Sequence, residues 1–340
     1  MSHVSLREPG VPYIAFAQLL ESQILHPEAV ERFRSIMARE RTDETILLQL
    51  DGQVPMRWFR EVYPQLDTEL ATHLGHAFAQ QAQLTSFGPL SVPLISAGSV
   101  SEVMELLTYV PLISTAVSTR FHPNEQGLTV GLTGHTGDPD LDCLIVTYCG
   151  SALLRLIHLL IGPMSTVELH ARWPPPAAFT EHEHALRGHL RFDAPTTFLH
   201  VPKQTLNAVC RFSDPITYRL AIADLRTTLE QRSGTSTYTT TVRTLLDEHP
   251  KLKAMQTVAD ELGISPSTLK RRLGEEGTTF RELRDSSLLE LATLRLLDRS
   301  LSVSQIAADL GYSDLTNFSH AFKRWTGQSP RQFRRTCLIG

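Results

Sequence analysis

The sequence lacks the short motifs that most enzymes and metal-binding modules carry. It has no phosphate-cradling glycine loop, no G-x-S-x-G and no convincing pair of catalytic carboxylates. It has only four cysteines, and they form no C-x-x-C pair, which argues against a zinc ribbon and a dithiol redox motif: Cys143, Cys149, Cys210 and Cys337. We therefore expect no catalysis and no cofactor, and we expect the cysteines to be reduced thiols.

A histidine cluster is the one feature that suggests a metal site. His182, His184 and His189 are close in sequence, but they stand two and five residues apart, whereas ligands on a helix usually stand three or four apart. The sequence therefore predicts a surface cluster of histidines and no metal.

Long apolar runs are also missing. The most apolar stretch, residues 152–161, contains Arg155 and His158 and is far shorter than the twenty or so residues that cross a bilayer. The first residues do not have the pattern of a signal peptide. The sequence thus predicts a cytoplasmic protein with no membrane segment.

The chain has no overall excess of positive charge. Its net charge is −4 and its pI is near 6.4. From Arg243 onward, however, 15 Lys and Arg stand against 12 Asp and Glu, a net charge of +3, which leaves −7 for residues 1–242. Charge therefore supports nucleic-acid binding only in the C-terminal part, and there the arrangement of the basic residues matters more than their number.

The length of 340 residues predicts about two domains. The stretch 232–241 is rich in hydroxyl residues and has no apolar period, which is typical of an exposed linker. We therefore predict a first domain over residues 1–232, a linker over 233–242 and a second domain over 243–340.

The first domain has the pattern of a mixed α+β fold. Residues 127–133 and 167–173 alternate with the period of a strand, and residues 196–201 form a third candidate. Helical patterns cover residues 101–109, opened by Ser101 as a cap, and residues 152–161.

Two segments near the C-terminus share the pattern of a helix-turn-helix. Each has an early alanine that lets two helices approach, a turn glycine, Gly263 or Gly311, and a serine able to cap a second helix, Ser265 or Ser313. Ser302 and Gln305 form a capping box that opens the second unit. Between the units, Thr279 and Glu282 form another, ahead of a leucine-rich stretch over residues 280–297. The sequence thus predicts an all-α domain in which a linking helix joins two helix-turn-helix units.

The second helix of such a unit enters a DNA major groove. Leu269 and Leu273 fall on one face of the first, and Phe318 and Phe322 on one face of the second. The outward residues are the candidate DNA contacts: Ser267, Thr268, Lys270 and Arg271 in the first unit, and Thr316, Asn317, His320, Lys323 and Arg324 in the second. Arg271 suits a guanine edge and Asn317 an adenine edge, whereas Lys323 and Arg324 suit phosphate. Taken alone, such residues usually form only a solvated helix face.

The C-terminal segment resembles the DNA-binding domain of AraC-type transcription regulators. The family signature is met by Ile306-Ala307, Gly311-Tyr312-Ser313, Phe318-Ser319, Phe322-Lys323-Arg324, Gly327, Ser329-Pro330 and Phe333-Arg334. One departure is Leu288, where members of the family often have an arginine on the linking helix.

Most of residues 10–230 resemble the larger N-terminal domain of AraC-type regulators of the ornithine-utilisation, quorum-virulence and cholera-toxin-activator kind. The resemblance is carried by Phe87-Gly88-Pro89-Leu90 and by Leu190-Arg191-Phe192-Asp193-Ala194-Pro195. It implies an effector-binding and dimerisation domain for an amino acid derivative, a fatty acid or a similar small molecule. It further implies a homodimer on promoter DNA that contacts RNA polymerase if it is an activator. The resemblance assigns no pocket residue.

Two alternatives to an effector-controlled regulator remain. The first is a regulator of the same family that has no ligand and is controlled by protein contacts. The second is an enzyme or DNA-repair protein that carries this DNA-binding module.

Overall fold

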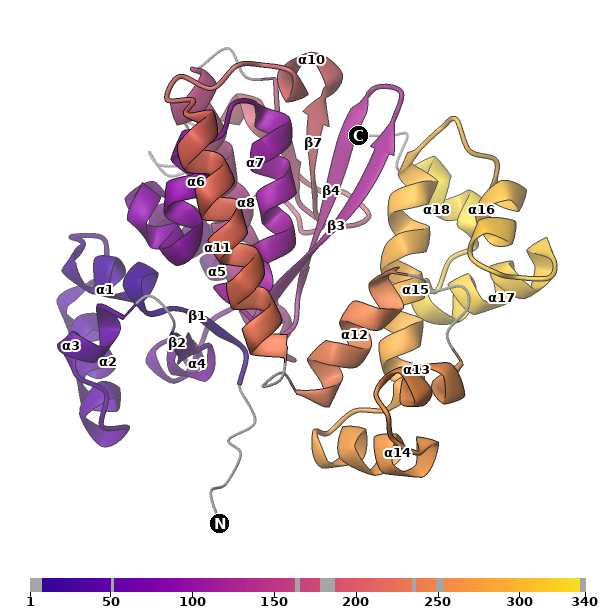
Figure 1. Ribbon diagram of the computed structural model, residues 1–340, viewed down its shortest axis with the longest axis horizontal. Coiled ribbons are helices and arrows are strands. Elements are labelled where there is room, and N and C mark those ends of the chain that lie inside the picture. Colours follow the sequence, from indigo (N-terminus) through magenta and orange to yellow (C-terminus); the bar gives the residue numbers. More distant parts are fainter. Residues whose placement is uncertain are drawn as a thin grey trace. The chain divides into compact units, whose positions relative to one another are not determined.

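The computed structural model describes residues 8–49, 52–162, 166–177, 187–233, 237–248 and 254–336. The chain divides into two compact units, Arg7–Leu229 and Glu230–Gly340, called here the N-terminal and C-terminal domains. The first combines helices with a sheet and the second is helical (Figure 1), which confirms the predicted fold class. His182, His184 and Cys337 lie outside the described residues.

The N-terminal domain contains a five-stranded sheet with the strand order β3-β4-β7-β5-β6. Its strands are β3 (Val117–Asn124), β4 (Gly127–Gly134), β5 (Glu168–His170), β6 (Leu190–Arg191) and β7 (Phe198–Pro202). Neighbours are antiparallel except β5 and β6, which are parallel. The register places Val130, Leu199 and Leu169 in one cross-strand row, and all three are buried. A separate ladder pairs β1 (Gly10–Pro12) with β2 (Gln53–Pro55).

The N-terminal domain also contains helices. They are α1 (Tyr13–Glu21), α2 (Pro27–Arg39), α3 (Glu44–Leu47), α4 (Arg57–Val62), α5 (Thr68–Gln81), α6 (Ser91–Ser96), α7 (Val100–Leu106), α8 (Pro139–Ile161), α10 (Lys203–Leu206) and α11 (Pro215–Ser233). Short 3₁₀ helices, η1 (Leu84–Leu90), η2 (Leu107–Leu112) and η3 (Arg187–His189), connect some of them.

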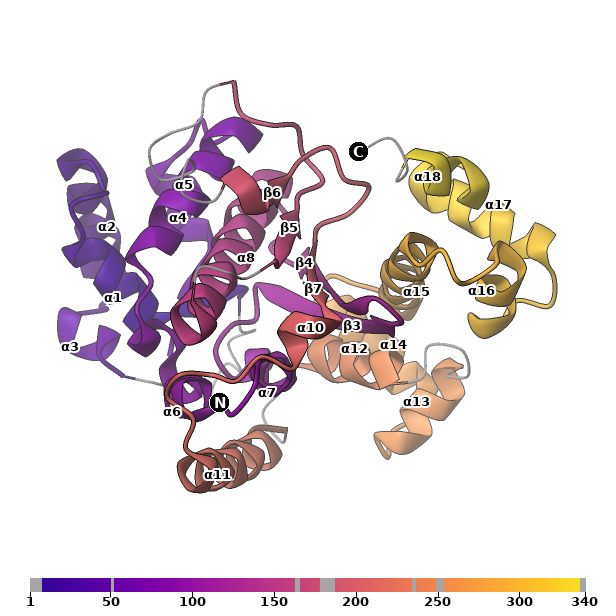
Figure 2. The same ribbon diagram turned by 90° about the horizontal axis from the view of Figure 1, so that it is seen from above.

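Helix α8 is the central helix of the domain, between α5 and the sheet (Figure 2). Close packing depends on two glycines: a Cβ at Gly75 of α5 would lie 2.7 Å from Thr147, and one at Gly150 would lie 2.7 Å from Leu169. Among the described helices, α8 alone has the length and apolar composition of a membrane span, but 67% of its most apolar window is buried inside the protein. That burial is typical of the core helix of a globular domain.

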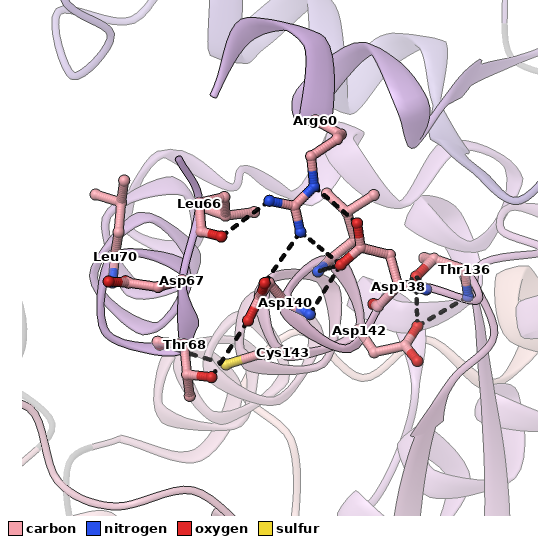
Figure 3. A network of polar contacts seen from close by, with 11 residues as sticks. Arg60, Leu66, Asp67, Thr68, Leu70, Thr136, Asp138, Asp140, Asp142 and Cys143 are labelled. Atoms are coloured by element: carbon pink, nitrogen blue, oxygen red, sulfur yellow. Dashed lines mark hydrogen bonds and ion pairs between the residues drawn. The ribbon is translucent and has the colours of Figure 1, made fainter. Parts of the chain in front are cut away.

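A polar network fixes the start of α8 (Figure 3). Arg60 of α4 donates to both carboxylate oxygens of Asp138, at 2.7 and 2.5 Å, and to Asp140 at 3.1 Å. Asp138 also caps α8 by accepting from two backbone N–H groups of its first turn. Because the guanidinium and these donors favour the carboxylate, the pKa of Asp138 is lowered. Thr68 of α5 donates to Asp140 at 3.3 Å, so the network holds α4, α5 and α8 together.

Several predicted elements of this domain need correction. The strands at 127–133 and 196–201 are confirmed as β4 and β7, but the segment 167–173 is a strand only over Glu168–His170. Strand β3 was missed, because its Arg120 and Pro123 interrupt the alternation. Helix α7 is capped by Ser99, whose side chain accepts from the N–H of Glu102, and not by Ser101. The apolar run 152–161 is only the second half of the 23-residue α8.

The C-terminal domain consists of seven helices within its described residues. They are α12 (Tyr238–Glu248), α13 (Met255–Glu261), α14 (Pro266–Glu275), α15 (Phe280–Leu297), α16 (Val303–Asp309), α17 (Leu315–Thr326) and α18 (Pro330–Thr336). They form two hydrophobic clusters. The first includes Val258, Leu269 and Leu273, and the second includes Ile306, Phe318 and Phe322. Each predicted helix-turn-helix therefore has its own core.

The predicted linker is wrong over residues 238–242, which form the first turns of α12. Val242 is fully buried in the first cluster. The carboxylate of Glu276 accepts from the N–H groups of Tyr238 and Thr239, at 2.9 and 2.7 Å, and so caps the helix from outside it. A hydroxyl-rich sequence that is typical of a linker is thus held as a helix by tertiary contacts.

Candidate DNA interface and ligand cavity

The first helix-turn-helix is built as its sequence predicts. Gly263 has φ of +65° between α13 and α14, a left-handed conformation that suits glycine. Ser265 caps α14, accepting from the N–H of Thr268 at 3.1 Å, and Pro266 occupies the first turn, where its missing N–H is no loss. The buried Ala259 allows the close approach of the two helices. The outer face of α14 is thereby presented to solvent.

The second unit repeats this design with one difference. Gly311, with φ of +79°, makes the turn between α16 and α17, and the predicted capping box of Ser302 and Gln305 opens α16. The cap of α17 is Asp314 and not the predicted Ser313, because the Asp314 carboxylate accepts from the N–H of Asn317 at 2.8 Å. This hydrogen bond lowers the pKa of Asp314.

The linking helix α15 begins at the predicted capping box, where Thr279 accepts from the N–H of Glu282 and Glu282 accepts from that of Thr279. Its first turns bury Phe280 and Leu283 in the first cluster, and its later turns bury Leu288 in the second. Eighteen residues make a rod of about 27 Å. That length is of the order of the roughly 34 Å between successive major grooves on one side of DNA. Leu288, which departs from the family pattern, is a core residue here.

The candidate contacts of α14 are accessible, with one exception. Ser267, Lys270 and Arg271 are exposed, but Thr268 is half-buried and its hydroxyl bonds that of Ser265 at 2.9 Å. Arg271 forms an ion pair with Glu275 at 2.5 Å. Arg272 lies over the ring of Tyr238, 5.8 Å from its centroid, a contact the sequence did not suggest.

The candidate contacts of α17 are all exposed: Thr316, Asn317, His320, Lys323 and Arg324. The side-chain amide of Asn317 donates to Ser313 and Asp314, at 3.2 and 2.7 Å, so it is already oriented by the start of the helix. Arg324 lies 3.3 Å from Asp285 of α15 and against the ring of Trp325. Lys323 has no ion pair within the described residues.

Two adjacent cavities lie inside the N-terminal domain. One, of about 480 Å³ with its opening, is lined by α1, α5 and α8; the other, of about 770 Å³ with its opening, is lined by η1, η2, β3, β4 and α8. The space that a water-sized sphere can occupy in them is only about 40 and 70 Å³, so a small-molecule ligand would have to move the walls apart. Both are bordered by Ser86, Ile145 and Tyr148. None of the described residues that line them carries a formal charge.

Most polar groups in the cavity walls already have partners. Ser86 donates to Gln18, Ser114 donates to the carbonyl of Gly10 at 2.7 Å, and Thr119 donates to that of Leu107 at 3.1 Å. The Tyr148 hydroxyl forms no hydrogen bond with the described part of the chain, and neither does the amide of Gln81. Of these two, only Tyr148 borders both cavities.

The cavity walls keep their ionisable groups neutral. Burial raises the pKa of Tyr148 well above its usual value and that of Cys149 to about 12. At neutral pH the larger cavity therefore has a phenol and a thiol in its wall, and no phenolate or thiolate. Among the described residues, no group of histidines, cysteines and carboxylates is placed to hold a metal ion.

Two capped helix-turn-helix units joined by a linking helix are the architecture of a DNA-binding regulator. The family comparisons lead to the same class of protein. The model of the arabinose-binding domain of AraC transcription regulators matches residues 26–209, more than half of the chain, and a helix-turn-helix domain model matches residues 258–336. The chain therefore belongs to the AraC family of transcription regulators.

Several transcription regulators are similar to this chain. The HTH-type transcriptional regulator VqsM of Pseudomonas aeruginosa is 27% identical over 270 residues, 74% of this chain and 81% of its own. The ornithine utilization regulator of the same organism is 29% identical over 189 residues, 54% of this chain and 55% of its own. The crystal structure of the transcriptional regulator CdpR, also from Pseudomonas aeruginosa, covers 92% of this chain and 100% of its own, with 22% identity and a TM-score of 0.40.

Proposed function

We propose that this regulator binds promoter DNA through the exposed faces of α14 and α17 and is controlled by a small apolar effector in the cavities of the N-terminal domain. The observation that carries the effector proposal is the Tyr148 hydroxyl, which lacks a hydrogen-bond partner in the described chain at the border of two uncharged cavities. Tyr148 is half-buried, and its hydroxyl, with no partner in the described chain, is available to donate to or accept from a ligand atom.

The residues that line the two cavities favour some classes of effector over others. A zwitterionic amino acid would have to bury two charges without a counter-charge among the described lining residues, which is strongly unfavourable. An acyl chain or an aromatic ring, by contrast, would gain the hydrophobic free energy of the apolar walls. We therefore favour a mainly apolar effector whose single polar group meets Tyr148. Among the expected classes we favour fatty-acid-like molecules, which carry at most one charge, over amino acid derivatives, which carry two.

The two recognition helices have different tasks in this proposal. Lys270 and Arg271 of α14 and Thr316 and Asn317 of α17 lie on exposed faces toward the beginning and middle of their helices and suit base edges. Lys323 and Arg324, in the last turn of α17, suit phosphate. Ser267 and His320 are secondary contacts, and Thr268 serves mainly the cap of α14.

Control by an effector requires that it bind two states of the protein with different affinity. We propose that the bound and empty N-terminal domains differ in how well the chain, as a homodimer, occupies two DNA half-sites. An activator of this design would also contact RNA polymerase.

The effector proposal is tested by thermal shift of the full-length chain with matched ligands: a medium-chain fatty acid, its methyl ester, the corresponding alcohol and free ornithine. Binding to the folded state raises the melting temperature. We expect a shift with the apolar compounds and none with ornithine. Tyr148→Phe should reduce the shift given by the alcohol, with Tyr109→Phe, which lines neither cavity, as the matched control.

Two outcomes would contradict the proposal. A shift with ornithine alone would show that the cavities are not the site. No shift with any apolar compound, together with unchanged DNA binding, would favour a regulator controlled by protein contacts.

A further inference from the structure

Two exposed polar residues at the start of α17 are joined by a pair of hydrogen bonds. One oxygen of the Asp314 carboxylate accepts from the backbone N–H of Asn317 at 2.8 Å, and the other accepts from its side-chain amide nitrogen at 2.7 Å. The hydroxyl of Ser313 accepts from the same amide nitrogen at 3.2 Å. An amide nitrogen has two hydrogens, so both are engaged within the protein.

The chemistry of the carboxylate fixes which way the amide of Asn317 is turned. The hydrogen bond from the backbone of Asn317 lowers the pKa of Asp314, which is therefore ionised at neutral pH. An ionised carboxylate can only accept hydrogen bonds, so the amide must direct its nitrogen, and not its oxygen, toward Asp314. The amide oxygen of Asn317 is left with no partner among the described residues.

This orientation limits what Asn317 can recognise on DNA. An asparagine reads adenine through two hydrogen bonds, accepting from the N6 amino group and donating to N7. The second bond needs an amide hydrogen that Asp314 and Ser313 already hold. One exposed acceptor remains, and it fits the amino group of adenine or cytosine but is repelled by the carbonyl oxygen of guanine or thymine.

We propose that Asn317, positioned by Asp314, selects a base that has an amino group in the major groove and does not distinguish adenine from cytosine. Every base pair has one such group, on adenine in A·T and on cytosine in C·G. Asn317 thus determines which strand carries the amino group at one position of the site. This inference rests on the proposed binding of DNA by α17.

The first helix-turn-helix differs at the equivalent place. Thr268 is the third residue of α14, as Asn317 is of α17, and its hydroxyl bonds that of the cap Ser265 at 2.9 Å. Both groups are neutral hydroxyls, each able to donate or accept. The restriction to an acceptor therefore depends on the charged cap of α17, and a serine at position 314 would copy the neutral cap of α14.

The first test uses the full-length chain and a DNA site selected from a random library. The position read by Asn317 is the one at which Asn317→Ala removes selection. Competition between the four base pairs at that position should show adenine and cytosine binding within about twofold of each other, and guanine and thymine at least about fivefold more weakly, as expected for one hydrogen bond. Replacing adenine there by 7-deazaadenine, which lacks N7, should not weaken binding.

Asp314→Ser tests the positioning role. Serine still caps a helix, so the variant should fold, which circular dichroism establishes. It frees an amide hydrogen of Asn317 for N7, so adenine should gain several-fold over cytosine, and 7-deazaadenine should abolish that gain. Asp260→Ser is the matched control, because it removes another exposed carboxylate from the same domain. It should leave the ratio of adenine to cytosine unchanged, whatever the loss of charge does to overall affinity.

The outcomes separate this inference from the proposal on which it rests. Wild-type preference for adenine over cytosine that disappears with 7-deazaadenine would overturn the inference and leave DNA reading by α17 standing. An unchanged ratio of adenine to cytosine in folded Asp314→Ser would overturn the role of Asp314. Unaltered selection at every position in Asn317→Ala would overturn both the inference and the assignment of Asn317 to a base.

Discussion

Arg271 on the exposed face of α14 is paired with Glu275, one helical turn further on, at 2.5 Å. The two side chains are 58% and 49% exposed, so the pair is screened by water and contributes on the order of 0.5 kcal/mol. Arg272 shares the same carboxylate at 3.5 Å. Glu275 is therefore a weak internal competitor for the arginine that we expect to read DNA.

Glu275→Gln should raise the affinity for DNA several-fold, because it frees Arg271 and removes a negative charge that would lie near phosphate. Fluorescence anisotropy with a promoter fragment at fixed salt measures this. Glu105→Gln, on an exposed site of the N-terminal domain, makes the same charge change and should have a smaller effect. Equal effects of both variants would mean that only net charge matters.

Arg271→Ala should weaken binding to the preferred site by about 1 to 3 kcal/mol and relax selection at one base pair, as the loss of a bidentate guanine contact does. Competition between single-base variants of the site measures this. A lower melting temperature with unaltered base preference would instead show that Arg271 has a structural role.

Lys323→Ala should weaken binding to all sequences alike and reduce the slope of log affinity against log salt by about one, because one phosphate contact and its released counterion are lost. The salt titration of Asn317→Ala is the comparison: it should leave the slope intact while altering sequence preference. A sequence-dependent effect of Lys323→Ala would contradict its assignment to phosphate.

Asp138→Asn should destabilise the N-terminal domain by about 1 to 3 kcal/mol at neutral pH, because asparagine can still cap α8 but cannot pair with Arg60. The pKa of Asp138 is lowered in the folded state, so its stabilisation is present above the ordinary aspartate pKa and is lost as pH falls through the folded value. Urea unfolding should therefore show a difference between wild type and variant that shrinks below about pH 4. Asp67→Asn, at a helix cap with no ion pair among the described residues, is the near-neutral control.

A C-terminal fragment that begins at Thr237 should be clearly more stable than one that begins at Arg243. The shorter fragment loses Val242, which is fully buried, and the capping contacts of Glu276 with the start of α12. Thermal unfolding of the two fragments measures the difference. Equal melting temperatures would show that α12 contributes little to the first unit.

Local chemistry explains which features the sequence predicted well. The turn glycines, the boxes at Thr279 and Ser302, and the buried pair Phe318 and Phe322 each depend on residues a few positions apart. Short-range patterns of this kind are sufficient to place both helix-turn-helix units. The same helical periodicity identified the outward-facing residues of α14 and α17.

Features that depend on distant contacts were missed. The start of α12 is capped by Glu276, far along the chain, so a threonine-rich segment resembled a linker. The cavities arise where α1, η1, the sheet and α8 come together, and no motif marks Tyr148 as part of their wall. Helix α11 was also not predicted, because its apolar residues lie on two faces and give no clear single face.

The most direct test of the account is a footprint of the full-length chain on DNA selected from a random library. Because α15 joins the two recognition helices, we expect each protomer to protect two successive major grooves, about 10 bp apart. We expect the dimer to protect two such half-sites, and the arrangement of the half-sites to change when an apolar effector is added. Arg271→Ala and Asn317→Ala should each remove selection in a different one of the two grooves. Protection of a single groove per protomer, or loss of selection in the same groove with both variants, would contradict the claim that α14 and α17 read DNA together.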